Sequence, residues 1–90
     1  MSLDSIYVEN LYKVLSQIDD ASVLKEFLND LCTYKEIEQM AQRLEAAKLL
    51  LENNTYEEVI KKTEISSATL SRVSKCVKYG QGYKKVLKND

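Results

Sequence analysis

The stretch from residue 55 to residue 75, TYEEVIKKTEISSATLSRVSK, decides the fold of this chain of 90 residues. It contains two short helical patterns that meet at a tight turn. Thr55 is followed three residues later by Glu58, the spacing of a capping box, which predicts a helix start. Ser66 can cap a second helix in the same way. The residues expected to face inward and hold the two helices at a steep angle are Val59, Thr63, Ile65, Leu70 and Val73.

Such a pair of helices is typical of a helix-turn-helix, which places its second helix in the major groove of DNA. With Ser66 as cap, small side chains occupy the first turn of the second helix, where such helices read base edges. Cations follow further along the same helix and suit contacts with phosphate. We expect DNA contacts from Ser66, Ser67, Ala68, Thr69, Ser71, Arg72, Lys75, Lys61 and Lys78.

Two residues depart from the usual motif. The turn normally holds glycine where this chain has Glu64, because the backbone there tends toward positive φ, which would cost a glutamate on the order of 1 kcal/mol. Ile60 stands where the first helix usually has alanine, so it either splays the helices or points elsewhere. These departures, with an acidic first half, motivate an alternative: a protein-interaction module that keeps the fold without specific DNA binding.

The charges are distributed unevenly along the chain. Residues 1–54 carry 5 cations and 10 anions, a net charge of −5, whereas residues 55–90 carry 8 cations and 4 anions, a net charge of +4, which together give the overall −1. Phosphate binding depends on the local face and not on the total charge. The distribution therefore favours a basic DNA-binding end on an otherwise acidic protein.

Composition excludes several other classes of protein. The chain has no proline and no histidine, and its two cysteines, Cys32 and Cys76, do not form a CxxC pair. We therefore predict no metal site, and partly buried free thiols in a reducing compartment. Without histidine, a nucleophile motif or a glycine-rich phosphate loop, we predict that the protein is not an enzyme. The absence of a signal peptide or a long apolar run predicts a cytoplasmic protein without membrane association.

Helical spacing continues through the rest of the chain. Apolar residues predict a first helix over about residues 4–17, a second after Asp19 and Asp20, and a long third helix that Thr33 begins and that ends at Glu52. A loop is expected over residues 79–82 and a short last helix over residues 83–87. We predict an all-α chain of about six helices. Its single domain divides into dimerisation helices (1–52), the helix-turn-helix (55–78) and a basic C-terminal segment (79–90).

The first two predicted helices carry more apolar surface than a small DNA reader needs, which favours self-association.

Residues 31–78, LCTYKEIEQMAQRLEAAKLLLENNTYEEVIKKTEISSATLSRVSKCVK, resemble the Trp-repressor-like family of bacterial helix-turn-helix regulators, and more narrowly its YerC/YecD-type branch. The resemblance implies an intertwined all-helical homodimer that represses transcription. We therefore expect two partners, double-stranded DNA and a second copy of the chain.

The resemblance also implies a site for tryptophan. The family's threonine and two arginines match Thr33, Arg43 and Arg72, which suit the polar groups of an amino acid. The glycine beside the indole is Val73 here, whose side chain fills that space, and the family's serine matches Cys76. The capping box and the helix-turn-helix core explain Thr33 and Val73 without a ligand. We expect no cofactor and leave tryptophan, another small effector or no effector as alternatives.

Overall fold

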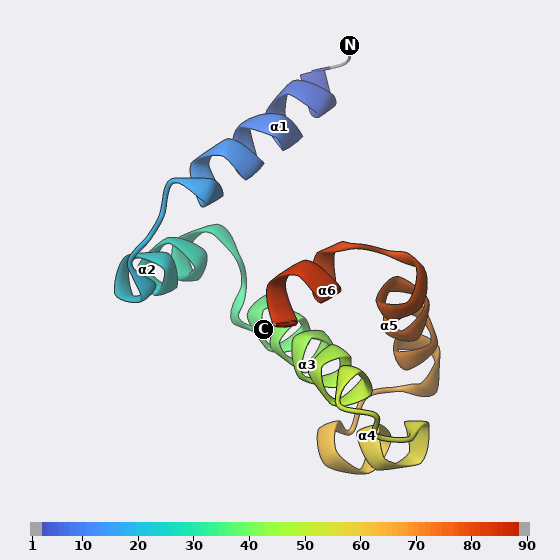
Figure 1. Ribbon diagram of the computed structural model, residues 1–90. Coiled ribbons are helices and arrows are strands. Elements are labelled where there is room, and N and C mark those ends of the chain that lie inside the picture. The colour runs from blue at the N-terminus through green and yellow to red at the C-terminus, as the bar shows by residue number, and fades with distance from the viewer. Residues whose placement is uncertain (1–2, 89–90) are drawn as a thin grey trace. The chain divides into compact units, whose positions relative to one another are not determined.

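Residues 3–88, which the computed structural model describes, form six helices and no strand. The helices are α1 (Leu3–Ser16), α2 (Ala21–Leu31), α3 (Tyr34–Leu51), α4 (Tyr56–Thr63), α5 (Ser67–Tyr79) and α6 (Gly82–Leu87) (Figure 1). The all-α prediction is confirmed. Contacts divide the chain into an N-terminal unit, residues 1–37, and a C-terminal unit, residues 38–90, with the boundary inside α3.

Side-chain caps define the first turns of α2 and α3. The Asp20 carboxylate accepts a hydrogen bond of 2.8 Å from the backbone N–H of Ser22, at the start of α2. At the start of α3, the N–H of Thr33 donates to Glu36 Oε1 (2.8 Å) and the N–H of Glu36 donates to Thr33 Oγ1 (3.1 Å). This reciprocal pair is the predicted capping box, and it satisfies N–H groups that have no partner within the helix.

The C-terminal unit contains the hydrophobic core. Its buried apolar side chains come from α3, α4, α5 and the turn between the last two: Ala46, Ala47, Leu49, Val59, Ile65, Leu70, Val73 and Val77. Ala46 and Ala47 have no exposed surface, which allows the backbone of α3 to lie close to its neighbours. Tyr83 and Leu87 of α6 pack against the same cluster, so α6 folds back over the other helices of this unit (Figure 1).

Two predicted details differ in the structure. The loop expected over residues 79–82 is shorter, because α5 continues through Tyr79 and α6 begins at Gly82. Gly80 makes this tight connection: its N–H donates to the Cys76 carbonyl (2.9 Å), and a Cβ there would lie 2.7 Å from the same oxygen. Cys76, expected to be partly buried, is exposed, whereas Cys32 is half-buried. Within residues 3–88, no helix is long and apolar enough to cross a membrane.

Candidate nucleic-acid interface

The helix-turn-helix begins with a capping box at α4. The N–H of Thr55 donates to Glu58 Oε1 (2.7 Å), and the N–H of Glu58 donates to Thr55 Oγ1 (3.2 Å). Hydrogen bonds to the Glu58 carboxyl from the backbone N–H of Thr55, and then from its hydroxyl, hold the pKa of that carboxyl below its ordinary value. The predicted start of α4 is thus confirmed.

A three-residue turn joins α4 to α5. Glu64 lies in the left-handed region, with φ 59° and ψ 21°, and its N–H donates to the Ile60 carbonyl (2.8 Å). Thr63, expected to face inward, is half-buried, and its hydroxyl donates to the Val59 carbonyl (2.7 Å) and accepts from the N–H of Ile65 (3.2 Å). The turn is therefore fixed by its own hydrogen bonds and by the burial of Ile65, while Ile60 points outward at 37% exposed.

The first turn of α5 is capped as expected. Ser66 Oγ accepts from the N–H of Thr69 (3.2 Å) and donates to Thr69 Oγ1 (2.9 Å). Thr69 is half-buried, whereas Ser66, Ser67 and Ala68 are exposed. Because the exposed side chains at this end are small, the N-terminus of α5 has the shape to enter a groove such as the major groove of DNA.

Helix α5 has one buried face and one exposed face. Its buried residues are Leu70, Val73, Ser74 and Val77. The remaining predicted DNA-contact residues of the helix are exposed: Ser67, Ala68, Ser71, Arg72, Lys75 and Lys78. At 3.6 residues per turn, these six occupy roughly 140° of the helix circumference, opposite the buried face. The packing of α5 therefore brings these predicted contact residues to one side of the helix.

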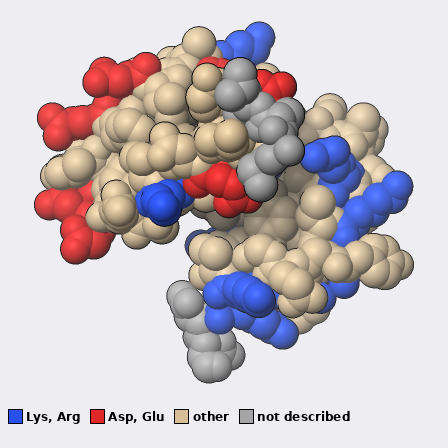
Figure 2. Space-filling view, turned by 90° about the horizontal axis from the view of Figure 1, so that it is seen from above, with Lys and Arg blue, Asp and Glu red and all other residues tan. Residues whose placement is uncertain are grey.

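The charge of this region is almost entirely positive. Between residues 59 and 88 the chain has eight cations and one acid, Glu64. Figure 2 shows blue Lys and Arg side chains gathered over the right-hand part of the surface. Lys61 is exposed on the last turn of α4, and Lys78 is exposed near the end of α5, so both are accessible to phosphate.

Two polar contacts that hold the motif were not predicted. Gln42 of α3 donates from Nε2 to the carbonyl of Thr63 (3.0 Å), which ties the long helix to the last turn of α4. Lys62 donates from Nζ to Asn54 Oδ1 (3.3 Å). Gln42 lies 21 residues from its partner, so no local pattern indicates the contact. These two hydrogen bonds thus help to hold α4 and the turn after it in place.

Comparison with known proteins gives one consistent result. The family described as Trp repressor protein matches residues 7–90, nearly the whole chain. The chain belongs to the Trp repressor family. A relative from Bacillus subtilis (strain 168), the uncharacterized protein YerC, is 41% identical over 73 residues, which cover 81% of this chain and 70% of YerC. Members of this family are regulators and not enzymes.

Solved structures of similar proteins agree with this assignment. A TrpR-like protein from Eubacterium eligens ATCC 27750 is 38% identical, with a TM-score of 0.85 over 91% of this chain and 86% of that one. A candidate Trp repressor from Staphylococcus aureus is 27% identical, with a TM-score of 0.86 over 98% of this chain and 92% of that one. The resemblance to the Trp-repressor-like family and its helical fold is confirmed.

The residues that the resemblance predicted for a tryptophan site lie in different environments. Thr33, in the N-terminal unit, takes part in the α3 capping box. Arg43 is half-buried on α3 and Arg72 is exposed on α5, both in the C-terminal unit. Val73 is 2% exposed and belongs to the core. Its side chain therefore fills space between the packed helices of the C-terminal unit.

Cys76 borders an apolar hollow of about 490 Å³ in the C-terminal unit. Its other lining residues come from α3, from α6 and from the connection between α5 and α6: Leu44, Gly80, Gly82, Tyr83, Val86 and Leu87. None of these residues is charged, so the hollow offers no charged side chain to the carboxylate or ammonium group of a free amino acid. Within the described residues, no group of three or more Cys, Asp or Glu is placed to hold a metal ion.

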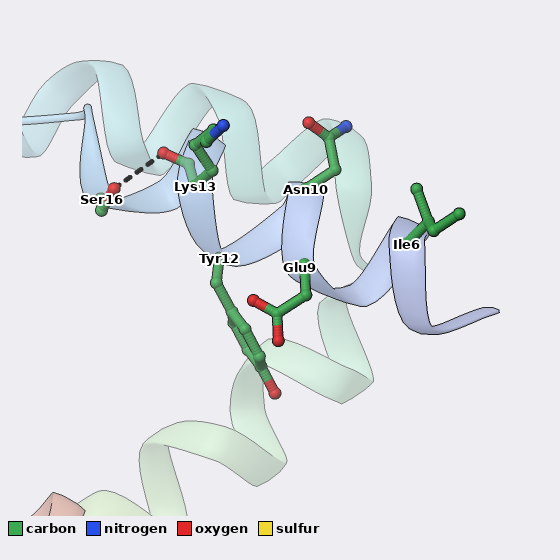
Figure 3. Close-up of a pocket in the computed structure, with 6 residues that line it drawn as sticks. All are labelled: Ile6, Glu9, Asn10, Tyr12, Lys13 and Ser16. Atoms are coloured by element: carbon green, nitrogen blue, oxygen red, sulfur yellow. Dashed lines mark hydrogen bonds between the residues drawn. The ribbon is translucent and has the colours of Figure 1, made fainter. Parts of the chain in front are cut away.

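The N-terminal unit presents a different kind of surface. No side chain described in residues 4–37 is buried, although this unit contains many apolar residues. Those that are large and clearly exposed on α1 and α2 are Ile6, Tyr7, Val8, Leu11, Tyr12, Val23 and Leu31. A shallow hollow of about 670 Å³ runs along α1 and is lined only by residues of that helix, among them Ile6, Glu9 and Tyr12 (Figure 3). Such a surface lacks a packing partner.

Proposed function

We propose that this protein is a transcriptional repressor that binds a specific DNA sequence as a homodimer. In this proposal α5 enters the major groove, with Ser66, Ser67, Ala68, Thr69 and Ser71 near base edges. Arg72 and Lys75 reach bases or phosphates, and Lys61 and Lys78 contact phosphates. Residues 55–78 act as the DNA reader, residues 1–52 as the dimerisation helices, and residues 79–90 as a basic extension.

The observation that carries the proposal is the division of α5 into two faces. The buried face anchors the helix through Leu70, Val73 and Val77. The exposed face begins with small hydroxyl side chains at the helix N-terminus and continues with cations. This order suits a helix whose N-terminal end reads bases while later cations neutralise phosphates. A helix with only a structural role has no need of this arrangement.

Dimerisation is supported by the apolar surface of the N-terminal unit. Tyr7 is 64% exposed, Tyr12 is 60% exposed and Leu31 is 51% exposed, so these side chains gain little from burial within one chain. A second copy would remove them from water at roughly 25 cal/mol per Å² of apolar area. A two-fold dimer would place its two recognition helices about 34 Å apart, one turn of DNA.

A selection from random duplex DNA, run with and without L-tryptophan, tests the function. We expect enrichment of a near-palindromic sequence, and affinity for it that falls steeply as salt increases. Enrichment of no sequence by a protein that is dimeric would instead favour a protein-interaction module. Affinity that stays constant from low to physiological salt would contradict phosphate contacts. Dependence of enrichment on tryptophan would show that Val73 does not exclude the effector.

Two substitutions separate base contacts from phosphate contacts. Thr69→Ala should relax the base preference at one operator position, because it removes a hydroxyl from the first turn of α5. Lys78→Ala should weaken binding to all sequences alike and reduce the salt slope by about 1. Lys48→Ala, which removes an exposed cation from α3, serves as the control and should leave binding unchanged. If both test variants bind like the unsubstituted protein, α5 is not the reading helix.

The dimer is tested separately by sedimentation equilibrium. Leu11→Glu places a charge in the apolar surface of α1, and we expect it to shift the protein toward monomer. Asp4→Asn, an exposed residue of the same helix that does not line the hollow, is the control and should remain dimeric. If the unsubstituted protein is monomeric at micromolar concentration, the exposed apolar residues do not drive dimerisation and this part of the proposal is wrong.

A further inference from the structure

Glu64 combines a left-handed backbone with an exposed acidic side chain. Its backbone is left-handed, at φ 59°, and it is one of two described residues other than glycine with positive φ. The other is Asn53, at φ 69°, and asparagine tolerates this conformation because its short side chain can bond locally. Glutamate has no such compensation, so the turn holds a strained residue where glycine would be unstrained.

The backbone role of this position does not require a glutamate. The N–H of Glu64 donates to the Ile60 carbonyl (2.8 Å) and ends α4, and any residue other than proline provides this bond. The Glu64 side chain is exposed, so it contributes no packing to the core. What glutamate adds to the turn is a carboxylate at the surface.

Glu64 lies close in sequence to the end of α5 that would face DNA phosphates in the proposed complex. Glu64 is two residues before Ser66, the N-cap of α5, and is the only acid between residues 59 and 88. The N-terminus of a helix attracts phosphate through its unpaired N–H groups and partial positive charge. The Cα atoms of two residues at this spacing lie at most about 7 Å apart, which is less than the Debye length of about 8 Å at physiological salt. A phosphate drawn to this helix end is therefore repelled by Glu64.

We propose that Glu64 limits the affinity of the helix-turn-helix for the phosphate backbone, so that stable binding depends on the base contacts of α5. The inference rests on the proposed DNA-binding function. Binding to non-operator DNA is almost entirely electrostatic, whereas operator binding also has base contacts. Glu64 weakens the electrostatic attraction that contributes to binding of both kinds of DNA. Non-operator DNA then stays largely unoccupied at protein concentrations that still fill the operator, which has base contacts in addition.

The test uses the full-length protein and two labelled duplexes of equal length, the selected operator and a scrambled sequence, with binding followed by fluorescence anisotropy. Glu64→Gln keeps the shape and the backbone strain but removes the charge. It should tighten binding to both duplexes by about two- to fourfold at low salt, as expected for one unit charge near one or two phosphates. The salt slope should steepen by up to about 0.9 per subunit.

Two controls isolate the charge and its position. Glu64→Asp keeps the charge and should bind like the unsubstituted protein. Glu45→Gln removes an exposed acid from α3 and should also leave both affinities unchanged. Circular dichroism confirms that each variant is folded before binding is measured.

Each other result has a definite meaning. If Glu64→Gln leaves both affinities and the salt slope unchanged, the inference is wrong. If it weakens only operator binding, Glu64 contacts a base and the inference is also wrong, while the DNA-binding function stands. If the unsubstituted dimer binds neither duplex, the proposed function fails and this inference fails with it.

Discussion

Replacing Val73 by alanine removes two methyl groups from a side chain that is 2% exposed in the core beneath α5. Loss of their burial costs about 1.6 kcal/mol at roughly 0.8 kcal/mol for each group. The cavity left behind adds about 1 kcal/mol, because packed helices relax only partly into it. Alanine recovers about 0.5 kcal/mol through its higher helix propensity. We therefore expect Val73→Ala to lower the free energy of unfolding by about 2 kcal/mol.

The measurement is urea unfolding followed by circular dichroism at one protein concentration, because the stability of a dimer depends on concentration. Val86→Ala is the matched control, since it makes the same change at a side chain that is 70% exposed on α6. We expect the control to change stability by less than about 0.5 kcal/mol. If Val73→Ala and Val86→Ala lowered the free energy of unfolding equally, burial of Val73 would not explain its effect, and the reasoning would be refuted. Calorimetry of Val73→Ala with L-tryptophan also tests whether the smaller residue opens a binding site.

Three further predictions concern the caps and the turn. Ser66→Ala should lower stability by about 1 kcal/mol in thermal unfolding, because it removes the acceptor for an N–H at the start of α5, and Ser66→Asp should restore it. Glu64→Gly should be more stable than Glu64→Ala by about 1 kcal/mol, since only the glycine relieves the left-handed strain; equal melting temperatures would contradict the strain. Hydrogen bonds from the backbone and hydroxyl of Thr55 lower the pKa of Glu58 in the folded protein. The stability that the charged Glu58 carboxylate contributes is therefore complete above its ordinary pKa of 4.5 and is lost as the pH falls through the lowered pKa. Glu58→Gln should destabilise the protein at neutral pH and have little effect at low pH.

Local features of the fold were predictable because short-range chemistry determines them. The capping boxes at Thr33 and Thr55 and the cap at Ser66 each involve residues at most three positions apart, and all three are present. The left-handed backbone at Glu64 was also expected, since a turn this short between two helices requires one residue with positive φ. Helix spacing identified Val59, Leu70 and Val73 as core residues for the same reason.

Features that depend on contacts between distant residues were not predictable in this way. The bond from Gln42 to the Thr63 carbonyl joins α3 to α4 across 21 residues, and no periodicity indicates it. The exposure of Cys76 and the apolar hollow beside it depend on where α6 returns to the C-terminal unit. Gly80 carried a turn signal, but only the structure shows that a Cβ there would meet the Cys76 carbonyl.

The sequence by itself determined the helices, their caps, the helix-turn-helix and the family, because these depend on local spacing and on residue types at fixed positions. The sequence also predicted that Leu70 and Val73 face inward, but only the tertiary structure showed that Ser74 and Val77 complete the buried face of α5 and that Cys76 is exposed. It also joined α3 to the last turn of α4 through the bond from Gln42 to the Thr63 carbonyl. The physical reason is that burial depends on the packing of α3, α4 and α6 around α5, and that packing is a property of the whole C-terminal unit.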